Sequence, residues 1–308
     1  MTLTVFRTRS RFQFSVSLFP LLLIALTVQP LSSANAGEFS NHIGMRFVDI
    51  PAGHLLMGSC RLAESTLDEN RKRRFLGLKP LPPDCGNPDP NAQDNETPQH
   101  SVNVSGFQLA RTEVTLSQFK KFIAATGRFN LVNDKFMRAN SNGDDVPVVW
   151  VSWMDVQAFI NWLNKIKPAN DTGTYRLPSE AEWEHACRAG GKHDFCGGNN
   201  ANTVGWYYEN GGWHPRPVAG KQANAFGLYD MSGNVDEWVR DCYHPNYNGA
   251  PTDGSAWISG CGSSGYVLRS NSWKHYEAKY ARAAFRGEGK STLLNGRVGF
   301  RVARSVRP

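Results

Sequence analysis

The chain has 308 residues, a formal net charge of +7, six cysteines and nine tryptophans. Its basic residues are scattered apart from one cluster at residues 71–74, which is typical of a solvated face rather than of a nucleic-acid site. We therefore expect no nucleic-acid partner. Beyond the N-terminus, no stretch approaches the apolar length that a membrane span needs.

Residues 1–36 have the pattern of a secretory signal peptide. Arginines between residues 7 and 11 form a basic region, residues 18–28 are mostly apolar, and a small-residue cleavage site ends at Ala36. We expect cleavage there and an exported protein, periplasmic or secreted, whose mature chain, residues 37–308, is not held in the membrane. An uncleaved anchor is the alternative.

All six cysteines lie in the mature chain, and an even number in an exported protein favours disulfides. The absence of a C-x-x-C pair argues against a thioredoxin-like site and a zinc ribbon. The segment near residues 60–95 is polar, charged and proline-rich, which predicts a surface insertion closed by its own disulfide. Sequence order suggests local pairing, although other connectivities are open: Cys60 with Cys85, Cys187 with Cys196, and Cys242 with Cys261.

Alternating apolar residues predict strands in the first part of the mature chain. The pattern occurs at residues 45–50, restarts at 55–58, and continues at 101–104 and 107–114. The last two runs follow each other closely, so we expect them to pair with each other.

Helices are predicted where a capping box precedes an apolar stripe. From Gly190 onward the helical periodicity stops, and short aromatic phrases separated by Gly, Asn and Pro follow. Loops on a fixed scaffold commonly carry binding sites, so function is expected in this half. The capping boxes are Thr115 with Gln118, Ser152 with Asp155, and Ser179 with Glu182.

Within that half, residues 224–238 carry a pattern that suits a cation. Asp230 and Glu237 flank a Ser-Gly-Asn turn, and such turns expose backbone carbonyls. Ca²⁺ binds about six to eight oxygens from carboxylates and carbonyls. Asp230, the carbonyls of Gly233 and Val235, and Glu237 are therefore a reasonable ligand set. A solvated surface turn is the alternative, and spacing alone does not decide between them.

Several motifs follow one another along nearly all of the mature chain. F-V-D-I-P-A-G begins at Phe47, E-V-T at Glu113, R-L-P-S-E-A-E-W-E at Arg176, G-L-Y-D-M-S-G-N-V at Gly227 and G-F-R-V-A-R at Gly299. In this order they resemble the formylglycine-generating, or sulfatase-modifying factor, family. The resemblance implies a single α+β domain of the C-type-lectin-like kind, loop-rich and stabilised by structural calcium.

The resemblance also assigns metal sites. The calcium turn of the family corresponds to the ligand set at Asp230 to Glu237. Asn202 and Thr203 are partial matches to a second calcium site, whose other ligands the sequence does not identify.

The catalytic part of the family is where this chain departs. Family enzymes oxidise a sulfatase cysteine to formylglycine with O₂ and a copper ion held by two cysteines just after an Arg-Gly-Gly-Ser-Trp phrase. Here Arg269-Ser270-Asn271-Ser272-Trp273 is followed by no cysteine, and His275 stands where the first one would fall. One imidazole cannot replace two thiolates for Cu(I), so the copper-dithiolate route is not expected. By position, Ser272 and His275 are the catalytic candidates.

One functional hypothesis is an exported oxidoreductase that acts on a protein or peptide-derived substrate by another route. Members that resemble the pyoverdine-maturation oxidoreductase also lack the cysteine pair. A redox metal of unknown identity could be held if His214, His244 and His275 converge.

The alternative is a non-catalytic binding module or accessory subunit. Residues 267–305 resemble the variable region of diversity-generating retroelement targets, in which Tyr, Asn and charged side chains on a rigid scaffold make a recognition surface. That surface would consist of Asn271, Trp273, Lys274, Tyr276, Glu277, Lys279 and Tyr280.

Overall fold

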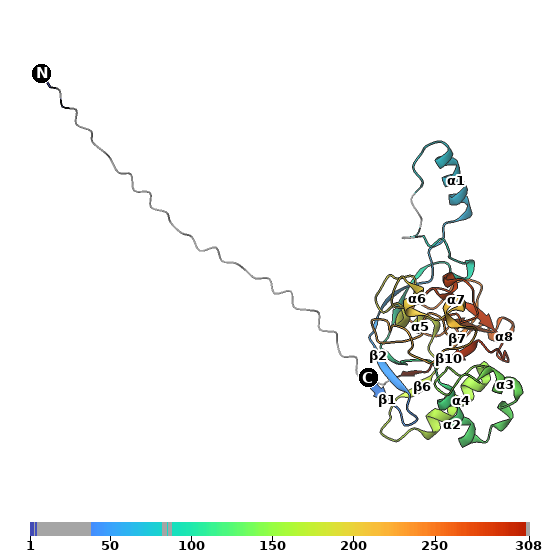
Figure 1. Ribbon diagram of the computed structural model, residues 1–308. Helices are drawn as coiled ribbons and strands as arrows, with labels where there is room; N and C mark the ends of the chain where they lie inside the picture. The colour runs from blue at the N-terminus through green and yellow to red at the C-terminus, as the bar shows by residue number, and fades with distance from the viewer. Residues whose placement is uncertain (3, 5–37, 82–84, 86–87, 306–308) are drawn as a thin grey trace. The chain divides into compact units, whose positions relative to one another are not determined.

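The computed structural model describes residues 1–2, 4, 38–81, 85 and 88–305 (Figure 1). The predicted cleavage site and most of the predicted signal peptide lie outside these residues. The chain divides into Met1–Asn35 and Ala36–Pro308, and every element below belongs to the second unit. Among the described residues, no helix has the length and apolarity needed to cross a membrane.

The first sheet has five strands and joins the two ends of the folded unit. Its last strand along the chain lies in its interior, because Ala303 pairs with Leu109 on one side and with Arg176 on the other. All neighbours in this sheet are antiparallel. The strand order is β1 (Glu38–Ser40), β2 (Arg46–Ile50), β5 (Phe107–Ala110), β11 (Ala303–Ser305) and β6 (Thr174–Arg176).

The second sheet carries the C-terminal loops. Its strand order is β10 (Val298–Phe300), β7 (Asp236–Cys242), β8 (Tyr266–Arg269) and β9 (Gly287–Gly289). The β10 and β7 strands are parallel, whereas β8 is antiparallel to both β7 and β9. Because Glu237 pairs with Arg269, the sheet brings the end of the predicted calcium turn beside the segment that precedes Ser270.

One expected pairing is wrong. The strand β4 (His100–Val104) pairs with β3 (Gly53–Met57) in a two-stranded sheet, whereas β5 pairs with β2 and β11. The β5 strand also ends at Ala110, before the predicted limit. Alternation of apolar residues identifies a strand and its buried face, but the partner is chosen by burial of residues distant in sequence.

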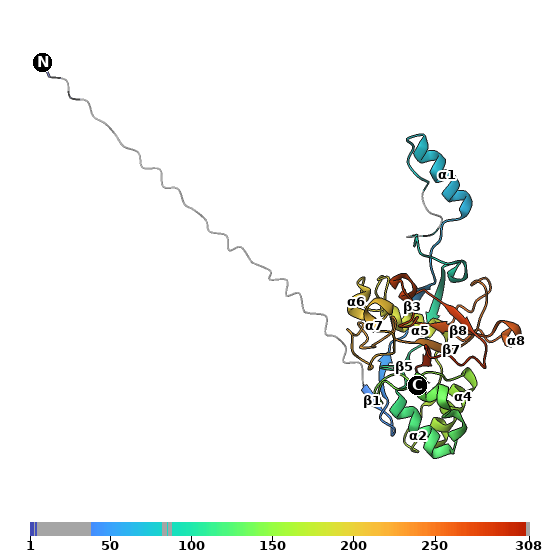
Figure 2. The same ribbon diagram turned by 45° about the vertical axis from the view of Figure 1, so that its right-hand side comes forward.

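The three predicted capping boxes are confirmed, and each begins a helix: α2 (Leu116–Thr126), α4 (Trp153–Ile166) and α5 (Glu180–Arg188). Figures 1 and 2 show α2 and α4 side by side. The Phe119 and Phe159 rings stack at 5.6 Å and pack against Phe300 of β10. These rings form much of the core that supports the second sheet.

Shorter elements complete the described fold. The insertion contains the helix α1 (Glu64–Phe75), which its polar composition did not predict. After Gly190 only short elements interrupt the loops, in agreement with a loop-rich α+β domain. The remaining helices and 3₁₀ turns are η1 (Asp94–Glu96), η2 (Phe129–Leu131), α3 (Asp134–Ala139), α6 (Ala201–Val204), α7 (Tyr208–Gly211), α8 (Cys261–Ser264) and η3 (Ala278–Ala281).

The predicted disulfide pairing is confirmed for all six cysteines. The pairs are Cys60–Cys85, Cys187–Cys196 and Cys242–Cys261, with Cα–Cα distances of 5.6, 4.7 and 4.7 Å. Disulfides persist in oxidising compartments, so this set suggests an extracytoplasmic protein.

Candidate functional site

A buried ion network fixes the segment that precedes the predicted site. Arg269 at the end of β8 is fully buried and donates hydrogen bonds to Glu180 and Glu184, each at 2.9 Å. Arg286 donates two further bonds to Glu180 at 2.8 Å. The guanidinium of Arg269 also lies 5.0 Å from the centre of the Trp183 ring. Each charge in this network has a partner, which is the condition under which buried ions are tolerated.

The next residues turn away from β8. Ser270 and Asn271 have positive φ angles of 79° and 73°, a region of backbone conformation that non-glycine residues rarely adopt. The Ser270 hydroxyl donates to the carbonyl of Gly233 at 2.9 Å, and the Trp273 N–H donates to the carbonyl of Asn234 at 2.9 Å. The candidate catalytic segment is thus held against the predicted calcium turn.

Polar side chains with no hydrogen-bond partner are concentrated at this turn. Asn271 and Ser272 are 1% and 0% exposed, yet neither side chain bonds to any residue that the structure describes. The indole N–H of Trp273 is also unpaired within the described chain. Buried polar groups normally have partners, so these three are available to a ligand or to water.

His275 lies beside these groups and is held by a short chain of charges. Arg297 contacts His275 Nε2 through Nη1 at 3.0 Å and forms an ion pair with Asp236 Oδ2 through Nε at 3.0 Å. Because a guanidinium only donates, Nε2 accepts and the ring proton lies on Nδ1. Burial, followed by the positive charges of Arg297 and Lys274, lowers the pKa of His275 to about 4. The ring is therefore neutral at pH 7 and can donate one hydrogen bond through Nδ1.

Three aromatic rings border His275 on the surface. Tyr208 lies 3.9 Å from Tyr276 and 4.3 Å from Trp213, measured between ring centres, and the Tyr208 N–H donates to the His275 carbonyl. Trp213 and Tyr276 are 65% and 62% exposed. Exposed rings this large, gathered at one place, are typical of a contact surface. We call Tyr208, Trp213 and Tyr276 the aromatic rim.

The other predicted surface residues lie around the same segment. Lys274 and Glu277 are exposed, and Lys279 is half-buried. The Tyr280 ring packs on His275 with the ring centres 5.5 Å apart. The structure therefore brings most of the predicted binding surface to one loop, although Asn271 is buried beneath it.

The hypothesis that three histidines converge on a metal is wrong for this structure. His244 stacks on Trp257 at 3.5 Å, and His214 Nδ1 contacts its neighbouring carbonyl of Pro215. Across residues 38–81, 85 and 88–305, no group of three or more His, Cys, Asp or Glu side chains is placed to hold a metal ion. The three histidines lie in loops and have no regular spacing, so the sequence did not predict that their side chains meet.

The four predicted calcium ligands lie in very different surroundings. The carboxylate of Glu237 is fully buried and receives contacts from Arg301 at 2.6, 2.7 and 2.9 Å and from the Trp183 N–H at 2.7 Å. A carboxylate offers about four lone-pair sites, so those of Glu237 are occupied. The Gly233 carbonyl accepts from Ser270, and Val235 is buried. Glu237 therefore fits a metal poorly.

Asp230 fits a metal better. Its Oδ2 accepts from the Ala219 N–H at 2.7 Å, while Oδ1 has no hydrogen-bond partner among the described residues. Burial raises the pKa of Asp230 to about 6. A buried carboxylate oxygen without a donor is suited to a cation.

Glu113, which sequence reasoning did not select, lies close to Asp230. It is 1% exposed, and neither of its carboxylate oxygens accepts a hydrogen bond from the part of the chain that the structure describes. Burial first, and then the charge of Asp230, raises the pKa of Glu113 well above its ordinary value. The E-V-T motif that begins at Glu113 was the available signal, but it identified the family without assigning this residue a role.

At the predicted second calcium site, the oxygens of Asn202 already accept hydrogen bonds from the protein. The Asn202 side-chain carbonyl accepts from Tyr207 at 2.8 Å and from Asn210 at 3.0 Å, and its backbone carbonyl accepts from the Lys221 ammonium at 2.7 Å. The Thr203 hydroxyl donates to Asn200. An ammonium beside Asn202 supplies positive charge without a metal, and the second calcium site stays a prediction.

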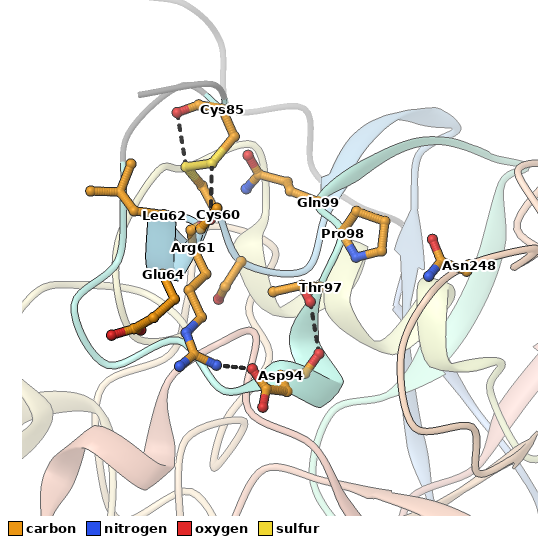
Figure 3. A pocket seen from close by; sticks show the side chains of 12 residues that line it. Cys60, Arg61, Leu62, Glu64, Cys85, Asp94, Thr97, Pro98, Gln99 and Asn248 are labelled. Atoms are coloured by element: carbon orange, nitrogen blue, oxygen red, sulfur yellow. Dashed lines mark hydrogen bonds and ion pairs between the residues drawn. A yellow bond between two sulfur atoms is a disulfide. The ribbon is translucent and has the colours of Figure 1, made fainter. Parts of the chain in front are cut away.

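A cavity of about 760 Å³ lies beside the insertion and shares no lining residue with these sites. In Figure 3, Arg61 and Asp94 point toward each other as an ion pair, and the Cys60–Cys85 disulfide lies nearby. Pro98 and Asn248 belong to its opposite part (Figure 3). This cavity is therefore separate from the segment around His275.

The model of the sulfatase-modifying factor enzyme 1-like domain matches residues 44–306, so the chain belongs to the formylglycine-generating enzyme and sulfatase-modifying factor family. The formylglycine-generating enzyme of Streptomyces coelicolor is 28% identical over 68% of this chain and 82% of its own length. The mouse (Mus musculus) enzyme is 27% identical over 72% of this chain and 73% of its own length.

The chain is also similar to a longer protein and to two solved structures. The chain is 28% identical to the serine/threonine-protein kinase Pkn1 of Chlamydia trachomatis, over 70% of this chain but only 36% of that protein's length. Among solved structures, PvdO from Pseudomonas aeruginosa superimposes with a TM-score of 0.68 at 28% identity, covering 88% of this chain and 99% of that one. Variable protein 1 of Treponema denticola has a TM-score of 0.61 at 22% identity, covering 90% of this chain and all of that one, and shows the fold alone.

Proposed function

We propose that this chain is an exported, calcium-stabilised oxidoreductase that acts on a protein or peptide-derived substrate at the surface around His275. The observation that carries the proposal is the replacement of the catalytic thiol position by His275, while all six cysteines are consumed in disulfides. The similarity to PvdO, a pyoverdine-maturation protein of this family, supports a route other than the copper-dithiolate one.

The residues around His275 would bind and orient the substrate. The aromatic rim offers ring surface to a peptide-derived group, and Ser272 and Asn271 offer hydrogen bonds that the protein itself does not use. His275 would donate from Nδ1, since Nε2 is held by Arg297. Removal of two electrons from the substrate requires an acceptor, for which dioxygen, the oxidant of family enzymes, is the first to test.

Export and calcium belong to the same proposal. Residues 1–36 would act as the signal peptide, leaving residues 37–308 as the mature domain in the periplasm or outside the cell. Calcium at the turn from Asp230 to Glu237 would hold the C-terminal loops in place, with Asn202 and Thr203 at a second site. The three disulfides support the extracytoplasmic part of this proposal.

The test is complementation of a Pseudomonas aeruginosa strain that lacks PvdO. The chain, with its own N-terminus, should restore pyoverdine fluorescence, and the His275→Ala and Ser272→Ala variants should abolish the restoration. His193→Ala is the matched control, because His193 is an exposed histidine outside the site. A folded, exported wild-type chain that restores no fluorescence would count against this substrate class.

The second candidate function is ligand binding without catalysis, and the exposure of Trp213 and Tyr276 favours it. The fold shared with the Treponema denticola variable protein is compatible with such a role. In that case no substrate would be oxidised, dioxygen would not be consumed, and Tyr276→Ala would still abolish capture of a ligand. A redox metal recovered with the purified protein would favour the oxidoreductase.

A further inference from the structure

The buried carboxylates below the predicted calcium turn fall into two groups. Glu237 has a full set of donors from Arg301 and Trp183. Glu113 and Asp230 together have three carboxylate oxygens that accept no hydrogen bond from the described chain. The negative charge of Glu237 is therefore compensated by donors, whereas the charges of Glu113 and Asp230 are not.

Glu113 and Asp230 are also close to each other. The backbone brings the two residues together, because the Tyr229 N–H, next to Asp230, donates to the carbonyl of Arg111, two residues before Glu113, at 2.9 Å. Burial, and then the charge of Asp230, raises the pKa of Glu113, and each carboxylate offers only acceptors when ionised. Both side chains are 1% exposed, so water does not screen the repulsion between them. The positive charge of Arg301 acts on both carboxyl groups, but its donors are directed to Glu237 and to the carbonyls of Ala110 and Tyr229. Two such carboxylates require a cation or a proton between them.

We propose that Glu113 and Asp230 bind the calcium ion as its two carboxylate ligands, and that Glu237 instead orients the turn through Arg301. Oxygen ligands from buried carboxylates suit a hard divalent cation, and backbone carbonyls and water would complete the shell. Glu113 lies between β5 and α2, whereas Asp230 lies just before β7. The ion would therefore link the segment that follows a strand of the first sheet to the turn that precedes a strand of the second sheet. This inference rests on the proposed calcium role and changes its ligand set.

The assignment predicts how calcium binding responds to three substitutions in the mature protein. Glu113→Gln and Asp230→Asn should each weaken Ca²⁺ affinity by at least about tenfold, because each removes a charged ligand. Glu237→Gln should lower the melting temperature yet leave the Ca²⁺ affinity within about threefold. Affinity is measured by calorimetric titration with CaCl₂ after chelator treatment, and bound calcium is counted by atomic emission. Circular dichroism at low temperature selects variants that are folded.

Each outcome has a distinct meaning. If folded Glu113→Gln binds calcium like the wild type while Asp230→Asn and Glu237→Gln do not, this assignment is overturned and the calcium role stands. If the wild type holds no calcium and chelator leaves its melting temperature unchanged, both the assignment and the calcium role fail. In that case a shared proton between the two carboxyls would be shown by a melting temperature that rises on acidification and by a Glu113→Gln variant as stable as the wild type.

Discussion

Two adjacent parts of one segment treat their buried polar groups in opposite ways. At the end of β8, the Arg269 charge is paired with Glu180 and Glu184, and only its Nε lacks a hydrogen-bond partner among the described residues. A few residues later, Asn271 and Ser272 are equally buried and have no hydrogen-bond partner in the described structure. The first part stabilises the fold, and the second is available for a ligand. The candidate functional site therefore begins within a few residues of a structural ion network.

The largest effect should come from the paired charges around Arg269. Arg269→Met leaves the buried carboxylates of Glu180 and Glu184 with fewer partners, which should lower the free energy of unfolding by about 3–5 kcal/mol. Denaturant unfolding measures the change. Arg240→Met, on the neighbouring strand, is the control, since Arg240 is exposed and its loss should cost less than about 0.5 kcal/mol. Similar costs for both variants would show that the Arg269 network does not hold the fold.

A smaller, pH-dependent effect should come from His275. Its pKa is lowered to about 4, whereas an unfolded histidine titrates near ~6.5, so the unfolded chain binds more protons between these values. Stability should therefore fall as the pH decreases from about 6.5 to about 4, by roughly 1–2 kcal/mol after allowance for solvent screening. Unfolding curves across this range measure the loss.

His275→Gln should remove that part of the acid sensitivity, because glutamine does not titrate. His193→Gln should keep the wild-type slope, since His193 is exposed and outside the site. An unchanged slope in the His275 variant would place the proton uptake at another group.

The smallest effect on stability should come from the aromatic rim. Tyr276→Ala and Trp213→Ala remove exposed rings, so each should change the free energy of unfolding by less than about 0.5 kcal/mol. Either one should nevertheless abolish restoration of pyoverdine fluorescence. Ile258→Ala, an equally exposed apolar side chain at 60%, should leave both properties unchanged. A rim variant that keeps full function would remove the rim from the site.

Local sequence rules predicted local structure well. The capping boxes at Thr115, Ser152 and Ser179 each begin a helix, because a side chain three residues away supplies the donor and acceptor that the helix end needs. The disulfides followed sequence order for a similar reason, as each closes a short loop. The family motifs then supplied the domain architecture.

Non-local partners could not be predicted in this way. The pairing of β4 with β3 depends on burial across the molecule, and Arg297 reaches both Asp236 and His275 only in the folded chain. Glu113 was hidden for the same reason, since its unpaired oxygens are visible only where it meets Asp230. The sequence identified the segment around His275 by its departure from the family motif, but it did not reveal Tyr208 or Trp213 as neighbours.

The interior position of β11 has a consequence for the order of folding. Until residues 303–305 are available for pairing, β5 has one open edge and β6 has no neighbour in its sheet. An open strand edge is a template for association with other chains. An incomplete chain would therefore present that edge to chaperones and proteases, which would recognise the incomplete molecule by the absence of one short strand.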